Sequence, residues 1–335
     1  MTRVFSGMQP SGAPHLGNYL GAWVNWLALQ ETADETIYCV VDLHAITSPV
    51  EHDPASLRRR TVELATAMLA IGIDPVRSTL FVQSHVTEHA ECTWLLNCVT
   101  SFGELRKQPQ FKEKSEGREF VSVGLFDYPV LQAADILLYH ADEVPVGEDQ
   151  RHHIELARNL GQRFNHRYGE VFTLPKAVHP PAAARVMDLQ DPARRMSKSS
   201  TAEKGIVYVL DEPKRVEKKI KSAVTDSDPD ARILHDRDAK PGVSNLLEIL
   251  SAVTGRPVAD LIAEHDGNGY GGFKTAVAEA VVERLRPIRD RYDELAADPA
   301  EVERILADGA ARARAIAGPT LERAREAMGL LAPRA

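Results

Sequence analysis

The fold is decided by the stretch Gly7-Met8-Gln9-Pro10-Ser11-Gly12-Ala13-Pro14-His15-Leu16-Gly17-Asn18, which directly follows a short apolar strand at Val4-Phe5. A strand, a Gly/Pro loop and the start of a helix succeed one another here. That order places backbone N–H groups and the positive end of a helix in front of an anion. A second stretch, Arg195-Met196-Ser197-Lys198-Ser199, offers two cations and two hydroxyls. Together the two stretches indicate a clamp for a nucleoside triphosphate.

The first half of the chain alternates strand and helix patterns. Apolar runs at Val4-Phe5, Ile37–Val41 and Leu80–Val82 are typical of buried strands, and helical spacing appears between the first two. The pair Asp53-Pro54 signals a helix that we expect to reach Met68-Leu69. Strand–helix repetition predicts an α/β fold with a Rossmann-like, doubly wound parallel sheet. Such sheets bind ligands at the carboxyl ends of their strands.

The second half has a different character. Beyond about Glu212 the strand patterns end and Ala, Glu, Arg and Leu dominate, which predicts a C-terminal all-helical domain. The pair Asp298-Pro299 signals the start of a long last helix. The predicted organisation is a Rossmann-like domain over 1–190, a mobile signature loop and linker over 191–211, and a helical region over 212–335. The last helix of that region can pack back on the first domain.

Composition narrows the class of protein. The 335 residues are 44% hydrophobic, which is ordinary for a globular protein with a sizeable core. Three cysteines are too few for a disulfide scaffold and favour a reducing compartment. No apolar run reaches the length of a membrane span and the N-terminus has no signal-peptide pattern. These features predict a cytoplasmic protein with no membrane partner.

The net charge of −8 argues against a nonspecific nucleic-acid coat, and no DNA partner is expected. A local basic face remains compatible with this total. Five cations lie at helical spacings and are expected to share one face: Lys214, Arg215, Lys218, Lys219 and Lys221. That face is either a solvated flank or a contact surface for RNA phosphates.

A single carboxylate interrupts the apolar helix predicted at Pro129–Tyr139. This residue, Asp135, shares a face with Gln132, three positions earlier. An unpaired buried carboxylate is costly, so Asp135 either faces water or meets a donor. An indole nitrogen is a donor only, and a fixed carboxylate is its natural partner.

Two other patterns do not carry a site. The run Gly267–Gly272 fits G-x-G-x-x-G, but a helix pattern precedes it where a dinucleotide site needs a strand, so we expect an interhelical turn. The residues His85, His89, Cys92 and Cys98 lack a Cys-x₂-Cys knuckle, and no metal site is expected among them.

The two opening stretches resemble the "HIGH" and "KMSKS" signatures of class I aminoacyl-tRNA synthetases. Asn18 stands where the first signature ends in His, which is the form seen in tryptophanyl-tRNA synthetases. The resemblance extends to further segments: Phe5–Gly7, Val41–Thr47, Gln110–Ser115, Gly147–Gln150, Ala223–Ser227 and Ser244–Leu247. On these motifs the chain is identified as a member of the bacterial-type tryptophanyl-tRNA synthetases, over nearly its whole length.

The resemblance implies a reaction and its partners. ATP, with Mg²⁺, would activate L-tryptophan to tryptophanyl-adenylate, and tryptophan would pass to tRNA(Trp). The domain over 1–190 would bind ATP and tryptophan, the region over 212–335 would bind the anticodon, and the protein would be a homodimer. A tyrosyl-type enzyme, another nucleotidyl transferase and a non-catalytic paralogue that binds tRNA or tryptophan stay open as alternatives.

The resemblance also implies roles for individual residues. Charge on the departing pyrophosphate would be balanced by Lys198, Arg195 and Lys114. ATP would be bound by Gln9, Pro10, Ser11, His15, Gly17, Asn18, Gly147, Glu148, Asp149, Val186, Met196, Ser197 and Ser199. Tryptophan would be bound by Asp135, Phe5, Gly7, His44, Tyr128, Gln132, Gln110 and Gln150. Arg195 departs from the Lys of many relatives, and its planar guanidinium is not equivalent to an ammonium group.

Overall fold

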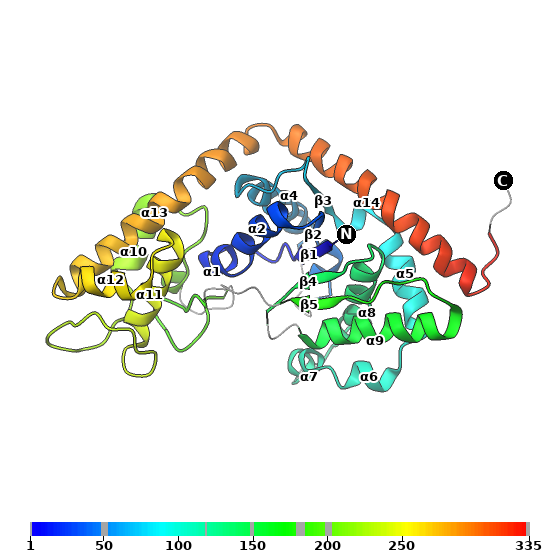
Figure 1. The fold of residues 1–335 in the computed structure, drawn as a ribbon, viewed down its shortest axis with the longest axis horizontal. Coiled ribbons are helices and arrows are strands. Elements are labelled where there is room, and N and C mark those ends of the chain that lie inside the picture. Colours follow the sequence, from blue (N-terminus) through cyan, green and yellow to red (C-terminus); the bar gives the residue numbers. More distant parts are fainter. Residues whose placement is uncertain are drawn as a thin grey trace.

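A five-stranded parallel sheet forms the centre of the first half of the molecule. The computed structural model describes residues 2–47, 53–117, 119–147, 151–178, 185–197 and 203–332. The strand order is β3-β2-β1-β4-β5. The strands are β1 (Arg3–Met8), β2 (Glu35–Val40), β3 (Ser78–Val82), β4 (Glu143–Pro145) and β5 (Lys176–Val178). The predicted Rossmann-like sheet and its first three strands are therefore confirmed (Figure 1).

Helices connect the strands and cover both faces of the sheet (Figure 1). The Asp53 carboxylate accepts from the backbone N–H of Ser56 and so caps α4, as Asp53-Pro54 predicted. A π-helical segment, η1, lies inside the first crossover between α1 and α2. The helical elements of this half are α1 (Leu16–Asn18), η1 (Tyr19–Trp23), α2 (Val24–Thr32), α3 (Asp42–Ala45), α4 (Pro54–Ala70), η2 (Gln83–His85), α5 (Glu88–Asn97), α6 (Phe102–Arg106), α7 (Pro109–Ser115), α8 (Val123–Leu137) and α9 (Arg151–Tyr168).

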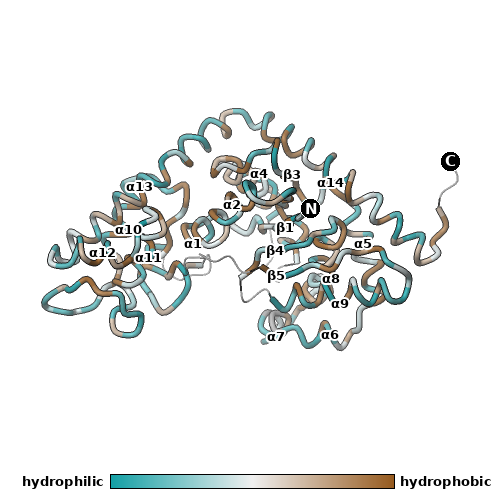
Figure 2. Tube along the Cα trace, in the orientation of Figure 1, coloured by the Kyte–Doolittle hydropathy of each residue, from teal (hydrophilic) through white to brown (hydrophobic). Residues whose placement is uncertain are grey.

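The described part of the second half is helical, as expected. Its elements are η4 (Glu203–Gly205), α10 (Pro213–Lys221), α11 (Pro241–Thr254), α12 (Val258–His265), α13 (Gly269–Ala296) and α14 (Pro299–Ala327). The last helix begins at Pro299, and Asp298 caps it through the N–H of Glu301. Helices α13 and α14 form an arch over the sheet (Figure 1). Hydrophobic and hydrophilic residues alternate along this arch (Figure 2), as expected for helices with one buried face.

The two long helices contact different parts of the molecule. Helix α13 packs against α10, α11 and α4, and α14 packs against β3 and α5. Arg312 of α14 donates to the carbonyl oxygens of Ser78 (3.1 Å) and Pro75 (2.6 Å). A Cβ on Gly309 would lie 1.8 Å from the carbonyl oxygen of Leu80. Since β3 is an edge strand, these contacts place α14 along its outer edge. A helix in this position protects an edge strand from pairing with another chain.

The central strand β1 is paired less extensively with β4 than with β2. β1 pairs with β2 along its whole length, whereas its register with β4 contains one pair, Val4 and Glu143. The chain fills the sheet on the β2–β3 side first and then crosses to β4 and β5. The carboxyl end of β1 is therefore a topological switch point, where α/β sheets bind ligands.

Among the described residues, no helix combines the length and apolar character that crossing a membrane requires.

Candidate active site

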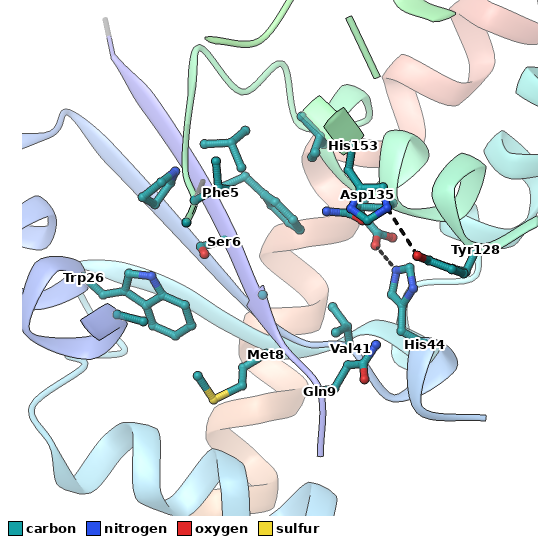
Figure 3. A pocket seen from close by; sticks show the side chains of 18 residues that line it. Phe5, Ser6, Met8, Gln9, Trp26, Val41, His44, Tyr128, Asp135 and His153 are labelled. Atoms are coloured by element: carbon teal, nitrogen blue, oxygen red, sulfur yellow. Dashed lines mark hydrogen bonds and ion pairs between the residues drawn. The ribbon is translucent and has the colours of Figure 1, made fainter. Parts of the chain in front are cut away.

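A cavity of about 450 Å³ lies at this switch point. One wall comes from β1 and the loop after it, from Phe5 to Gln9, and the other from the end of β4, from Val144 to Gly147. Helices α2, α3, α8 and α9 contribute Trp26, His44, Asp135 and His153. Figure 3 shows His44, Tyr128, Asp135 and His153 gathered at one end of the cavity, with Met8 and Trp26 at the other. The cavity thus has a polar end and an apolar end.

The Asp135 carboxylate is buried and receives three hydrogen bonds. His44 Nε2 lies 2.7 Å from Oδ2, and His89 Nδ1 lies 2.6 Å from Oδ1. Gln83 Nε2 donates to Oδ1 at 2.7 Å. Burial alone would raise the pKa of the Asp135 carboxyl, but His44 and His89 outweigh it, and the pKa lies below its ordinary value. The group is therefore an ionised acceptor, as the sequence argument required of it.

Aromatic rings surround this carboxylate. Phe5 stacks on Tyr139 with ring centroids 5.4 Å apart, and His44 meets the edge of Tyr128 at 6.3 Å. The Tyr128 hydroxyl lies 3.3 Å from Nε2 of His153. Burial raises the pKa of Tyr128 to about 12, so the hydroxyl keeps its proton near neutral pH. Flat apolar walls beside an anionic acceptor suit a planar aromatic group that carries an N–H.

The first signature stretch is folded by a reciprocal cap. The backbone N–H of Asn18 donates to His15 Nδ1 (3.3 Å), and the N–H of His15 donates to Asn18 Oδ1 (3.0 Å). In the neutral imidazole the proton then sits on Nε2. A Cβ on Gly17 would lie 3.0 Å from His15 Nδ1, so glycine lets the ring lie over the backbone. Asn18, which stands where the signature usually ends in His, therefore has a structural role, because it completes this capping box.

The described part of the second signature stretch, which ends at Ser197, is held beside the first. Met196 is buried and its N–H donates to the Val186 carbonyl (3.0 Å). The side chain of Asn245 bonds the N–H (2.9 Å) and the carbonyl (3.1 Å) of Met187. The Cβ of Met196 is 3.7 Å from where a Cβ on Gly17 would lie. The segment before α10 also pairs with the first stretch, because Leu16 donates to the Val207 carbonyl (2.8 Å).

The predicted site residues divide into groups. The cavity is lined by eight of them: Phe5, Gly7, Gln9, His44, Tyr128, Gln132, Asp135 and Gly147. A second group consists of Val186, which bonds Met196, and of residues in the two signature stretches: Pro10, Ser11, His15, Gly17, Asn18, Arg195, Met196 and Ser197. The rest lie outside the described residues: Glu148, Asp149, Gln150, Lys198 and Ser199, together with the side chains of Gln110 and Lys114. Their roles stay predictions.

The prediction of one basic face on α10 is wrong for Lys219. Its ammonium group is buried, lies 2.5 Å from Asp211 Oδ2 and sits over the Tyr208 ring at 4.8 Å. Lys214 and Lys218 are exposed. Helical spacing allowed Lys219 to point outward, but the acidic Asp211 and the Tyr208 ring lie on the inner side of the helix and bind it there.

The chain is similar to one known protein family over most of its length. The family described as "tRNA synthetases class I (W and Y)" matches residues 1–286. The chain belongs to this class I synthetase family. "Tryptophan–tRNA ligase 2" of Streptomyces avermitilis is 54% identical over 332 residues, which cover 98% of this chain and 97% of that protein. The resemblance to tryptophanyl-tRNA synthetases is therefore confirmed.

Two solved structures of tryptophanyl-tRNA synthetases are similar to this synthetase over nearly the whole chain. Tryptophanyl-tRNA synthetase from Mycoplasma pneumoniae superposes with a TM-score of 0.87 at 36% identity, covering 99% of this chain and 98% of that one. The enzyme from Campylobacter jejuni, crystallised with ADP and tryptophan, gives 0.85 at 35% identity and covers 98% and 100% of the two chains.

Three residues of this synthetase's site had no predicted role. Gln83 and His89 bond Asp135 from 52 and 46 positions away, and His153 bonds Tyr128 from 25. The signal for Gln83 was its place at the carboxyl end of β3, where ligands of such sheets lie. His89 belonged to the cluster dismissed as a zinc site, and the structure gives it Asp135 and Tyr139 as partners.

Proposed function

We propose that this synthetase activates L-tryptophan with ATP and then transfers it to tRNA(Trp). The substrate carboxylate attacks the α-phosphorus of ATP, forming tryptophanyl-adenylate as pyrophosphate leaves. The terminal ribose hydroxyl of the tRNA then attacks the acyl carbon, and AMP leaves. Because the substrates bring their own nucleophiles, the protein supplies position and charge. The observation that carries the proposal is the ionised Asp135 at the aromatic-walled end of the switch-point cavity.

Tryptophan is assigned to the polar end of the cavity. Asp135 accepts the indole N–H, and Phe5 and Tyr128 contact the ring or the amino-acid group. The ATP phosphates lie toward the two signature stretches, which the structure joins through Gly17 and Met196. His15 Nε2 is the donor nitrogen of its neutral ring, and Lys198, Arg195 and Lys114 would balance charge on the pyrophosphate. The adenosine would contact Gly147, Val186 and Met196. The complex of the Campylobacter jejuni relative with ADP and tryptophan supports this pairing of ligands.

Magnesium enters this proposal with the triphosphate. Mg²⁺ is usually held through substrate phosphates and water, with few protein ligands. Among the described residues, no group of three or more His, Cys, Asp or Glu side chains is arranged to hold a metal by itself. The ion would neutralise charge on the β- and γ-phosphates.

A homodimer is also part of the proposal. Phe102 on α6 is 69% exposed, Phe120 just before α8 is 74% exposed, and Val123 at the start of α8 is 79% exposed. Phe102 and Phe126 have ring centroids 5.0 Å apart, so the apolar surface continues onto α8. Exposed apolar patches of this kind mark protein interfaces. Sedimentation should give a dimer for the wild type and a lighter species for Phe102→Glu; an unchanged mass would place the interface elsewhere.

A cytoplasmic location belongs to the same proposal. The cysteines are free, with Cys39 and Cys92 buried, which suits a reducing compartment.

ATP–pyrophosphate exchange with each standard amino acid tests the reaction. Exchange should depend on tryptophan, and tyrosine and phenylalanine should be far weaker. Equal or greater exchange with tyrosine would make the chain a tyrosyl-type enzyme. Tryptophan binding without exchange would make it a non-catalytic paralogue.

A further inference from the structure

The Gln83 side chain can take one orientation. The backbone N–H of Leu43, at the start of α3, is shared between Gln83 Oε1 and Asp42 Oδ1, each at 3.1 Å. The amide nitrogen is thereby directed to Asp135, where Nε2 donates to Oδ1 at 2.7 Å. A flipped amide would set an oxygen against the carboxylate and an NH₂ against the N–H, and both contacts would be lost. Gln83 is fully buried, so water could not replace them.

The orientation of the His89 ring is also fixed by its hydrogen-bond partners. Its Nδ1 lies 2.6 Å from Asp135 Oδ1, and an ionised carboxylate can only accept, so Nδ1 carries a proton. Its Nε2 lies 2.7 Å from the Tyr139 hydroxyl, so the ring bridges that hydroxyl and the carboxylate. Burial raises the pKa of Tyr139 well above its ordinary value, so this hydroxyl keeps its proton. A chain of hydrogen bonds therefore runs from Tyr139 through His89 to the carboxylate.

The donors around Asp135 leave one of its oxygens able to bind a ligand. A carboxylate oxygen accepts about two hydrogen bonds. Oδ1 receives both of its bonds from Gln83 and His89. Oδ2 receives His44 at 2.7 Å. Within the described part of the chain, Oδ2 is thus the oxygen of Asp135 that can accept once more.

We propose that Gln83, His89 and Tyr139 are positioning residues for amino-acid selection: they occupy Oδ1 and turn Oδ2 toward an aromatic N–H. None of the three lines the cavity, so they act through Asp135 and not on the substrate. The inference rests on the proposed function and deepens it, because it explains how one carboxylate is made selective for an indole N–H.

The test compares two substrates that differ in one group. In 3-(3-benzothienyl)-L-alanine a sulfur replaces the indole N–H, which removes the donor and keeps the ring shape. The ratio of kcat/KM for tryptophan to that for the analogue, measured by ATP–pyrophosphate exchange, reports the bond to Oδ2. We expect a ratio on the order of 10–100 for the wild type. Asp135→Asn sets the ratio of a site without the carboxylate.

Two variants should lower this ratio. Gln83→Met keeps the volume and removes both amide contacts, and we expect a fall of about tenfold. Tyr139→Phe removes one oxygen at the far end of this chain of hydrogen bonds, and we expect a fall of about threefold. In both variants the kcat/KM for the analogue should stay within about twofold of the wild type, because the analogue does not use the bond.

Gln30→Met is the matched control. Gln30 is also buried, and it bonds the Gly72 carbonyl (3.2 Å) and the Asp74 N–H (2.8 Å) outside the cavity. Its loss should lower stability and leave the ratio unchanged. A ratio that Gln83→Met and Tyr139→Phe do not change, or a loss shared equally by both substrates, would overturn the inference. If Gln83→Met does not fold, Tyr139→Phe decides alone. A wild type without tryptophan-dependent exchange would refute the proposed function instead.

Discussion

The buried pair of Lys219 and Asp211 shows how much one neighbour changes a charged residue. Both side chains are about 5% exposed, and Asp211 Oδ2 also accepts from the Tyr208 N–H. Lys219→Ala would leave a buried carboxylate with a weaker partner, so we expect a loss of about 3 kcal/mol in the free energy of unfolding. Lys218→Ala, one position earlier and exposed, should change it by less than about 0.5 kcal/mol. Urea unfolding measures both, and equal losses would contradict the buried pair.

Lys198 is the residue whose loss should separate the two chemical steps. Its predicted partner is the departing pyrophosphate, so it would stabilise the transition state more than bound ATP. Lys198→Ala should slow adenylate formation by roughly 10²–10³-fold. Transfer from preformed adenylate to tRNA should stay near the wild-type rate, because pyrophosphate has already left. Single-turnover measurements of each step check this, and equal slowing of both would remove Lys198 from the phosphate site.

Among the elements, α14 and β3 approach each other closely at Gly309. A Cβ at position 309 would overlap the carbonyl oxygen of Leu80, and neither backbone can move without shifting an element. Gly309→Ala should therefore lower the free energy of unfolding by about 1–3 kcal/mol. Gly271→Ala in α13 is the control, because nothing lies within 4 Å of its added Cβ. There alanine should stabilise the helix by up to about 1 kcal/mol. Equal effects in thermal unfolding would contradict the close approach.

Helix α10 offers a test of RNA contact that differs from the basic face expected at first. Lys214 and Lys218 are exposed, and their joint change to glutamate avoids the buried Lys219. If they contact phosphates, tRNA binding should weaken, and its salt dependence should flatten by about one unit of slope per lost contact. Amino-acid activation should not change. Unaltered tRNA affinity at low salt would mean that this flank is only solvated.

The sequence predicted the helices and strands better than it predicted the contacts between them. Strand patterns and the caps at Asp53 and Asp298 depend on neighbouring residues, so they could be found from the chain alone. The inward turn of Lys219 depends on Asp211 and Tyr208, and helical spacing does not decide which face is buried. The partners of Asp135 come from α3, η2 and α5, which only the folded sheet brings to α8.

For the molecule as a whole, His140 joins the sheet domain to the last helix. Its backbone has φ of 50°, its Nδ1 lies 3.2 Å from Thr173 Oγ1, and Arg323 donates to its Nε2 at 2.8 Å. Burial, Arg323 and Arg3 lower the pKa of His140 below its ordinary value of 6.5, against a smaller opposing effect of Asp142. The unfolded chain therefore takes up the proton first, and stability should fall as the pH drops through about 6.5.

His140→Asn tests this dependence, since Asn tolerates a left-handed backbone and does not titrate. The loss of unfolding free energy between pH 7.5 and pH 5.5, measured in urea, should be smaller in the variant than in the wild type. Identical pH profiles would show that protonation of His140 does not weaken the attachment of α14.

The position of α14 along β3 also concerns the order in which the protein is made. The ribosome synthesises β3 long before residues 299–327. The edge of the sheet at β3 therefore stays uncovered until the end of the chain has been made. During that interval Ser78–Val82, whose residues are all buried in the final fold, presents an apolar strand with open carbonyls at 78 and 80. Any nascent or truncated chain without the last helix would carry the same exposed strand and would be a substrate for chaperones or for aggregation.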